Sequence, residues 1–194
     1  MSVMPRIILA SASPRRRELM ERLGIPELLI RPAQGEEHMP EIGDPAEIVR
    51  TLSRQKAVEV ARGARPDDVI VAADTIVWLD SEALGKPKDE ADARDMLRRL
   101  SGRTHSVFTG VCVISGDRII SEAEESLVRF RPMTGKEIAS YVESGEPMDK
   151  AGAYGAQGLA GLFVERIEGS FSNVMGLPLC RLGNMLKKVG VELL

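Results

Sequence analysis

Apolar residues along the chain form short continuous runs that alternate with longer stretches of helical spacing. The runs at 6–10 and 69–73 predict buried strands, and the second contains three valine or isoleucine residues. Longer strands are expected at 104–114 and 118–130, with a turn at 115–117 between them. Further strand segments are expected at 76–79, 83–84 and 162–167.

Helices are marked by residues that cap their first turn. Ser13 followed by Pro14 is a favoured start signal. Capping-box patterns at 44–47 (DPAE) and 134–137 (TGKE) open two more helices. Further helices are expected near 89–100 and 177–189. Because helices and strands alternate irregularly, the pattern favours a mixed α/β sheet over a strictly parallel one.

Length and composition narrow the class of protein. No internal repeat or long linker divides the 194 residues, so one domain over residues 1–194 is expected. The 26 Lys and Arg against 29 Asp and Glu give a net charge of −3, which disfavours bulk nucleic-acid binding. No apolar run approaches the roughly 18 residues of a membrane-spanning helix. Cys112 and Cys180 stand far apart without a C-x-x-C motif, which argues against a zinc ribbon and makes a reducing cytoplasm the expected location.

The first candidate site is the turn at 11–14 (SASP) together with the three arginines at 15–17. Cations in the first turn of a helix meet the positive end of its dipole, which is unfavourable by roughly a few tenths of a kcal/mol each. A bound anion reverses that sign, and a strand–loop–helix start is a natural phosphate site. Alternatively, the arginines point to solvent or pair with Glu18 and Glu21. The spacing is not that of a Walker loop.

The second candidate is Asp74-Thr75, directly after the apolar strand. Sites in α/β sheets gather beyond the carboxyl ends of strands, where such a carboxylate can hold a divalent metal or activate water. The other interpretation is an aspartate that caps a turn. Lys56 lies on the apolar face of the second helix. Either its aliphatic chain covers the core while the ammonium reaches solvent, or the ammonium reaches a phosphate. Lys86, in a Gly-Lys-Pro loop, is by itself typical of a surface lysine.

The third candidate is the segment 146–158, in which glycines recur every three residues. The spacing is not G-x-G-x-x-G, so a dinucleotide fold is not indicated. Such glycines either let the backbone approach a ligand closely or form a flexible surface loop. Gln157 offers an amide that both donates and accepts hydrogen bonds, as binding to a base edge requires. His38 and His105 are too isolated to suggest a zinc site, and solvent or strand-end positions are expected for them.

Six segments together resemble the Maf family of nucleoside triphosphate pyrophosphatases, in the family's order and over nearly the whole chain. Each alone is weak, but the ordered set is highly specific. The segments are 11–16 (SASPRR), 73–75 (ADT), 85–87 (GKP), 101–105 (SGRTH), 146–158 (EPMDKAGAYGAQG) and 176–178 (GLP). The resemblance implies an α/β fold with a curved mixed sheet flanked by helices, two lobes and a central cleft. It also implies hydrolysis of a nucleoside triphosphate between the α and β phosphates, with a divalent metal cation (Mg²⁺ or Mn²⁺).

The same resemblance gives roles to individual residues. Asp74 matches the general base that activates water, and Glu37, in the Glu36-Glu37 pair, looks like a metal-linked carboxylate. The positions that match phosphate contacts are Ser11, Arg15, Arg16, Lys56 and Lys86. The branch of the family that looks like this chain hydrolyses dTTP and UTP, and its specificity positions match Arg15, Thr75 and Gln157. A homodimer is also what the resemblance suggests.

A triphosphate carries about four negative charges near neutral pH, which suits charge-assisted contacts from arginine and lysine. No Ser-His-Asp or Cys-His arrangement is evident, so direct attack by water is the simplest mechanism. Two other functions stay open: a nucleotide sensor that regulates cell division or septum formation without turnover, and an enzyme that clears modified pyrimidine nucleotides. A nucleic-acid-binding module is a distant third, since the acidic balance disfavours it.

Overall fold

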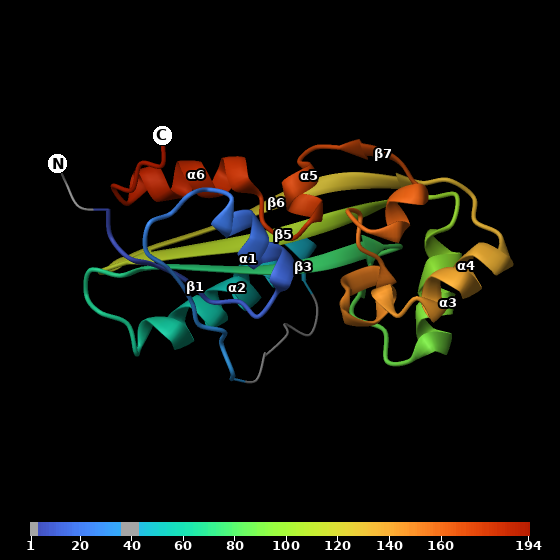
Figure 1. Ribbon diagram of the computed structural model, residues 1–194, viewed down its shortest axis with the longest axis horizontal. Coiled ribbons are helices and arrows are strands. Elements are labelled where there is room, and N and C mark those ends of the chain that lie inside the picture. Colours follow the sequence, from blue (N-terminus) through green and yellow to red (C-terminus); the bar gives the residue numbers. More distant parts are fainter. Residues whose placement is uncertain (1–3, 36–42) are drawn as a thin grey trace. The chain divides into compact units, whose positions relative to one another are not determined.

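The structure is a computed structural model and describes residues 4–35 and 43–194 (Figure 1). Its strands are β1 (Ile7–Leu9), β2 (Leu28–Ile30), β3 (Val69–Leu79), β4 (Glu82–Leu84), β5 (Thr104–Ser115), β6 (Arg118–Phe130) and β7 (Val164–Glu168). Over the described residues they join in the order β2-β1-β3-β5-β6-β7, with β4 paired to β3. β1 runs parallel to β2 and β3, whereas β4 is antiparallel to β3 and β7 to β6. The prediction of a mixed α/β sheet is therefore confirmed.

The helices begin where the capping residues predict. They are α1 (Pro14–Glu21), α2 (Pro45–Ala61), α3 (Glu90–Leu100), α4 (Gly135–Glu143), α5 (Phe171–Val174) and α6 (Leu179–Lys188), with short 3₁₀ helices η1 (Glu146–Asp149), η2 (Ala151–Ala153) and η3 (Leu159–Leu162). Ser13 caps α1, and Thr134 and Glu137 form a complete capping box on α4. Within residues 4–35 and 43–194, no helix is long and apolar enough to cross a membrane.

The chain divides into two compact units. The first contains residues 1–74, 109–124 and 176–194, and the second contains residues 75–108 and 125–175. β3 passes from the first unit into the second between Asp74 and Thr75. The expectation of a single domain over residues 1–194 remains a prediction.

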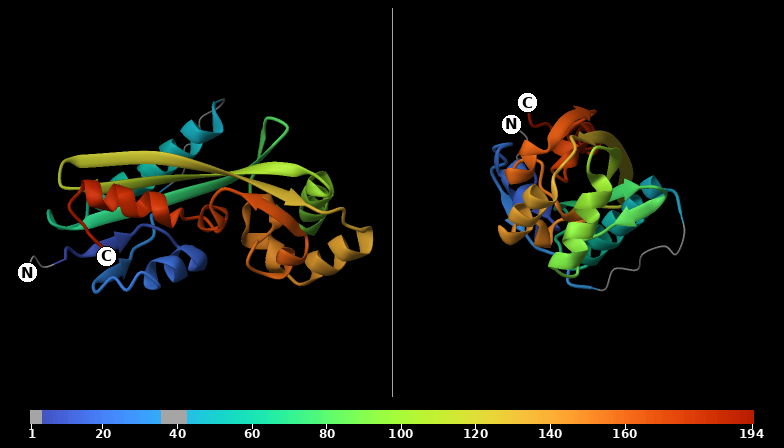
Figure 2. Two further views of the ribbon diagram at one scale, coloured as in Figure 1. Left: turned by 90° about the horizontal axis from the view of Figure 1, so that it is seen from above. Right: turned by 90° about the vertical axis from the view of Figure 1, so that its right-hand side faces the viewer.

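In the first unit, α2 is held against the sheet by close packing. Ala57 and Val60 of α2 form a buried cluster with apolar side chains of β1 and β3. Figure 2 shows α2 on one side of this part of the sheet and α6 on the other. Gly110 of β5 lies directly under α2: a Cβ atom there would be 2.7 Å from the backbone nitrogen of Arg50. The helix can therefore approach the strand this closely only because residue 110 has no side chain.

The second unit has a core of its own, built on α3, α4 and the neighbouring strands. Phe130, Tyr154 and His105 meet edge to face, with ring centroids 4.8–5.4 Å apart. Of the solvent or strand-end position expected for His105, the strand end is the one observed, since His105 is the second residue of β5. It is 3% exposed, and its Nε2 lies 2.7 Å from the Tyr154 hydroxyl. Burial lowers the pKa of His105 to about 4.

The structure differs from the sequence pattern in three further places. β3 does not end at Ala73 but continues through Asp74 and Thr75 to Leu79. Asp44 caps α2 by accepting from the Ala46 amide at 3.3 Å, while Glu47 forms an ion pair with Arg50 instead of closing a capping box. The short elements β2 and α5 have no counterpart in the predicted pattern, because three or four residues are too few to show a period.

Candidate active site

The turn after β1 carries the first group of predicted site residues. β1 ends at Leu9, and the Ala10 amide still donates to the carbonyl of Val71 at 2.8 Å. Ser11 is 6% exposed, and α1 begins three residues later. The start of α1 thus lies just beyond the carboxyl end of a buried parallel strand, which is the usual position of an anion site in an α/β sheet.

The guanidinium group of Arg16 is held in place from two sides. Its Nε donates to the backbone carbonyl of Gly176 at 2.7 Å, and its Nη1 donates to the hydroxyl of Ser11 at 3.3 Å. Gly176 has φ +107°, a conformation that side chains disfavour. The alternative that the arginines pair with nearby glutamates holds for Arg17, whose Nε lies 2.7 Å from Glu21. Arg16 is therefore preorganised by the glycine of the GLP motif.

Asp74 and Lys56 form the second group. The ammonium of Lys56 donates to Oδ1 of Asp74, and the two side chains are 17% and 12% exposed. The position of Asp74 beyond the end of a strand is wrong, because it lies inside β3. Neither interpretation of Lys56, a stem laid over the core or a contact with a phosphate, is decided by this contact with a carboxylate. A mostly buried carboxylate and ammonium thus neutralise each other at this point of the sheet.

The strand register brings these two groups to the same end of β1 and β3. Leu9 is paired with Val71, so two residues further along the parallel strands Ser11 is level with Ala73, next to Asp74. Neighbouring strands lie about 4.8 Å apart. Ser11 and Asp74 therefore lie toward the same end of β1 and β3 in the first unit. Arg16 is bonded to Ser11 and Lys56 to Asp74, and Arg15 is half-buried in the first turn of α1.

Thr75, Lys86 and Gln157 belong to the second unit. Thr75 is half-buried and follows Asp74 on β3, so it points to the opposite face of the strand. Lys86 is exposed in the loop after β4, and Gln157 is exposed between η2 and η3. The Gly152 amide donates to the carbonyl of Gly85 at 3.0 Å, which joins the loop of Lys86 to the segment that carries Gln157.

Residues that could hold a metal ion are few in the described chain. Within residues 4–35 and 43–194 no group of three histidine, cysteine or acidic side chains is placed to share an ion. Glu37 lies outside the described residues. Mg²⁺ is commonly bound by one or two carboxylates together with substrate phosphates, so the carboxylate of Asp74 fits such an ion as one of its ligands.

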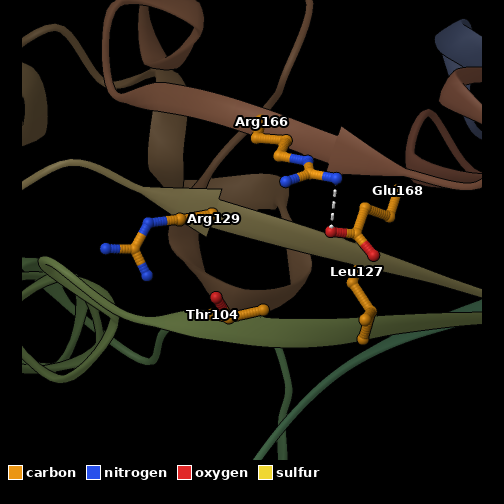
Figure 3. A pocket seen from close by; sticks show the side chains of 5 residues that line it. All are labelled: Thr104, Leu127, Arg129, Arg166 and Glu168. Atoms are coloured by element: carbon orange, nitrogen blue, oxygen red, sulfur yellow. Dashed lines mark ion pairs between the residues drawn. The ribbon is translucent and has the colours of Figure 1, made fainter.

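A separate shallow pocket of about 340 Å³ lies in the second unit, over β5, β6 and β7 (Figure 3). Its lining residues are Thr104, Leu127, Arg129, Arg166 and Glu168. Arg166 is paired with Glu168 at 3.0 Å and Arg129 with Glu165 at 2.8 Å, so both cations already have carboxylate partners. None of the described site candidates lines this pocket.

Comparison with known proteins agrees with this arrangement of motifs. The family model described as Maf-like protein matches residues 6–189. A protein of Symbiobacterium thermophilum named dTTP/UTP pyrophosphatase is 48% identical over 96% of this chain and 95% of its own length. A protein of the same name from Aquifex aeolicus is 47% identical over 96% of both chains. The predicted resemblance is confirmed.

Solved structures show the same fold at low sequence identity. The Staphylococcus aureus Ham1 protein is 14% identical, with a TM-score of 0.51 over 94% of this chain and 98% of its own. A HAM1 protein from Coxiella burnetii is 17% identical, with a TM-score of 0.52 over 95% of this chain and all of its own. These similarities support the predicted mixed α/β architecture and nothing more specific.

Proposed function

Because the chain belongs to the Maf family, we propose that it hydrolyses nucleoside triphosphates to the monophosphate and pyrophosphate, with dTTP and UTP as substrates. The relatives named dTTP/UTP pyrophosphatase match 96–97% of the chain, so the proposal covers its whole length. The observation that carries it is the contact between Lys56 and Asp74, one strand away from the turn that holds Ser11 and Arg16.

The cations near the start of α1 are proposed to bind the triphosphate. Arg16 is already oriented by Gly176 and Ser11, so little side-chain freedom is lost when it contacts a phosphate. Arg15, Lys56 and Lys86 are proposed to add further charge-assisted contacts. Since the transferred group gathers charge in the transition state, such preorganised cations contribute most of the stabilisation.

Asp74 is proposed as the general base. Its carboxylate accepts a proton from water as the water oxygen forms a bond to the α-phosphorus, and the bond from that phosphorus to the oxygen bridging the α and β phosphates breaks. Pyrophosphate leaves with the electron pair of the broken bond. Lys56, in contact with Oδ1, keeps the carboxylate oriented. When bound, a divalent cation supplies charge neutralisation on the phosphate oxygens, and Asp74 and Glu37 are the residues proposed to hold it.

Base selection is assigned to Arg15, Thr75 and Gln157, on the resemblance to the dTTP/UTP branch. A cytoplasmic location, a homodimer and the absence of nucleic-acid binding belong to the same proposal. The acidic net charge of −3 supports the last of these.

The test is a substrate panel on the purified protein. Each common nucleoside triphosphate, 7-methyl-GTP and 5-methyl pyrimidine forms are incubated with Mg²⁺ or Mn²⁺, and pyrophosphate is measured. We expect the highest kcat/KM for dTTP and UTP. Tight binding without turnover of any nucleotide would instead indicate a sensor, and a preference for modified bases would indicate a clearing enzyme.

The Asp74→Asn variant tests the role of the base. Nucleotide binding should be retained, while kcat falls by at least about 10²-fold, as removal of a general base predicts. Asp80→Asn is the matched control, since Asp80 is an exposed carboxylate paired with Arg103 at the β3–β4 turn. Near-normal pyrophosphate release by Asp74→Asn would remove this residue from the mechanism.

A further inference from the structure

We propose that Glu146 is a positioning residue that holds the turn carrying Gln157 and thereby sets the selection of uracil and thymine over cytosine. This inference rests on the proposed function, in which Gln157 reads the base. Glu146 has no role in the site described above. Its contacts, all within the second unit, indicate the positioning role proposed here.

The carboxylate of Glu146 and the hydroxyl of Tyr141 anchor the chain on both sides of Gln157. Oε2 of Glu146 accepts from the amide of Leu159 at 3.0 Å, and Oε1 accepts from the Tyr141 hydroxyl at 2.9 Å. The same hydroxyl accepts from the amide of Gly155 at 3.3 Å. The two anchored amides stand two residues before and two residues after Gln157, so one linked pair of side chains fixes both ends of a five-residue segment.

Between these anchors the backbone closes a tight turn. The amide of Gly158 donates to the carbonyl of Gly155 at 2.9 Å, which makes Gln157 the third residue of a four-residue β-turn. At this position Gln157 is exposed. Its side chain therefore starts from a backbone whose position is determined by Glu146.

Gly158 supplies independent evidence that Glu146 shapes this turn. A Cβ atom at Gly158 would lie 2.6 Å from the Cδ atom of Glu146, so the Glu146 carboxylate would have to move away from its present position. At Gly155 a Cβ atom would lie 2.7 Å from Cε of Lys150, whose ammonium donates to the Glu146 carbonyl at 2.6 Å. Both glycines of this turn, Gly155 and Gly158, thus leave room for Glu146 or for the lysine bound to its backbone.

The chemistry of the bases explains why a fixed turn gives selectivity. Uracil and thymine present an acceptor at O4, whereas cytosine presents an amino donor at the same position. An amide can match either base, because it carries both a donor and an acceptor, and it needs only to rotate. Only an amide held in one orientation and place rejects the wrong base, so freeing the turn should raise the use of CTP relative to UTP.

The test measures the ratio of kcat/KM for UTP to that for CTP on the same preparation. This ratio does not depend on the fraction of folded enzyme, so a merely structural role of Glu146 would leave it unchanged. In Glu146→Ala we expect it to fall at least 10-fold. Glu146→Gln keeps one acceptor for the Leu159 amide and should remain within about 3-fold of the wild type. Tyr141→Phe, which keeps the packing of the ring, should lie between them.

Glu137→Ala is the matched control. Glu137 is also a carboxylate of the second unit with several partners, Arg131 and Thr134, but it caps the start of α4. The Glu137→Ala variant should have a lower melting temperature and an unchanged ratio of kcat/KM for UTP to that for CTP. A ratio within 2-fold of the wild type in both Glu146→Ala and Tyr141→Phe would overturn the inference, and so would a Gln157→Ala variant with unchanged selectivity. Absence of pyrophosphate release from every nucleotide by the wild type would instead refute the proposed function.

Discussion

Replacement of Gly110 by alanine tests how the fold places Lys56 against Asp74. Gly110 lies in β5 under the first turns of α2, and its added methyl group would stand 2.7 Å from the Arg50 nitrogen and collide with the carbonyl of Val49. Both neighbours are backbone atoms, so neither can rotate away. The helix itself must move off the strand.

The size of the effect follows from that geometry. Ordinary contact requires about 3.4 Å or more between carbon and backbone atoms, so α2 has to shift by roughly 1 Å. Overpacking of this kind costs about 1–3 kcal/mol, and rigid backbone neighbours place it near the upper limit. For a chain of this size, about 3 kcal/mol lowers the melting temperature by roughly 6–12 °C.

The same shift should impair catalysis. Lys56 lies about two turns along α2 from the collision, and a misplacement of about 1 Å at a catalytic group can cost on the order of 10²-fold in rate. The assay is thermal unfolding combined with kcat/KM for UTP, measured below the melting transition. We expect Gly110→Ala to lower both.

Gly116→Ala is the control for the added methyl group. Gly116 has φ +54° in the β5–β6 turn, and nothing lies within 4 Å of its added Cβ. The free energy of unfolding of Gly116→Ala should fall by about 1 kcal/mol because of backbone strain, and the variant should keep its activity per folded molecule. If Gly110→Ala melts within a degree of the wild type, α2 is not seated as described. If it melts lower but hydrolyses UTP normally, the seating of α2 does not control Lys56.

Three other outcomes are expected. Buried His105 has a pKa of about 4 against an ordinary value of 6.5, so as the pH falls the unfolded chain takes up this proton before the folded one does. About 3 kcal/mol of stability that is present above pH 6.5 is therefore lost as the pH falls to 4. His105→Gln should lose less stability than the wild type between pH 6.5 and 4 in denaturant unfolding, and equal acid sensitivity of the two proteins would contradict this. Gly183→Ala, inside α6 with open space around the added Cβ, should raise stability by about 0.4–1 kcal/mol in urea unfolding, and a loss would contradict the open position. Removal of divalent ions with a chelator should abolish pyrophosphate release and Mg²⁺ or Mn²⁺ should restore it, whereas full turnover in chelator would exclude the predicted cation.

The fold was predictable where a signal is local. Ser13 and the box of Thr134 and Glu137 mark helix starts because each bond joins residues three apart. The strands at 104–114 and 118–130 are predicted because two extended segments flank the Ser-Gly-Asp turn at 115–117. The pattern predicts β3 as two segments, 69–73 and 76–79, because Asp74 and Thr75 interrupt its apolar run. Inside the sheet that carboxylate is matched by Lys56, 18 residues away, and a sequence window does not contain such a partner.

The candidate site shows the same division. The arginines after β1 carry their own electrostatic anomaly, so an anion site could be proposed from the residues alone. The weak signals of Lys56 and Lys86 acquired a role only through the family resemblance. The contact of Arg16 with Gly176 spans 160 residues and ends on a backbone carbonyl, which any residue type possesses. Residue 176 is a glycine because its φ is positive. A single glycine before Leu-Pro does not reveal, from the sequence, that its carbonyl binds Arg16.

The glycines at 152, 155 and 158 show what a sequence pattern leaves open. Their spacing indicates a backbone that something approaches closely, and a ligand or a flexible loop were the two interpretations. In the structure the approaching groups are the protein's own side chains: Val77 at Gly152, Lys150 at Gly155 and Glu146 at Gly158. A glycine records that space is needed but not what fills it. Val77 is buried and Lys150 and Glu146 are half-buried, all in the same unit as Gln157, so the glycines serve Gln157 indirectly, by leaving room for the side chains around which its turn is built.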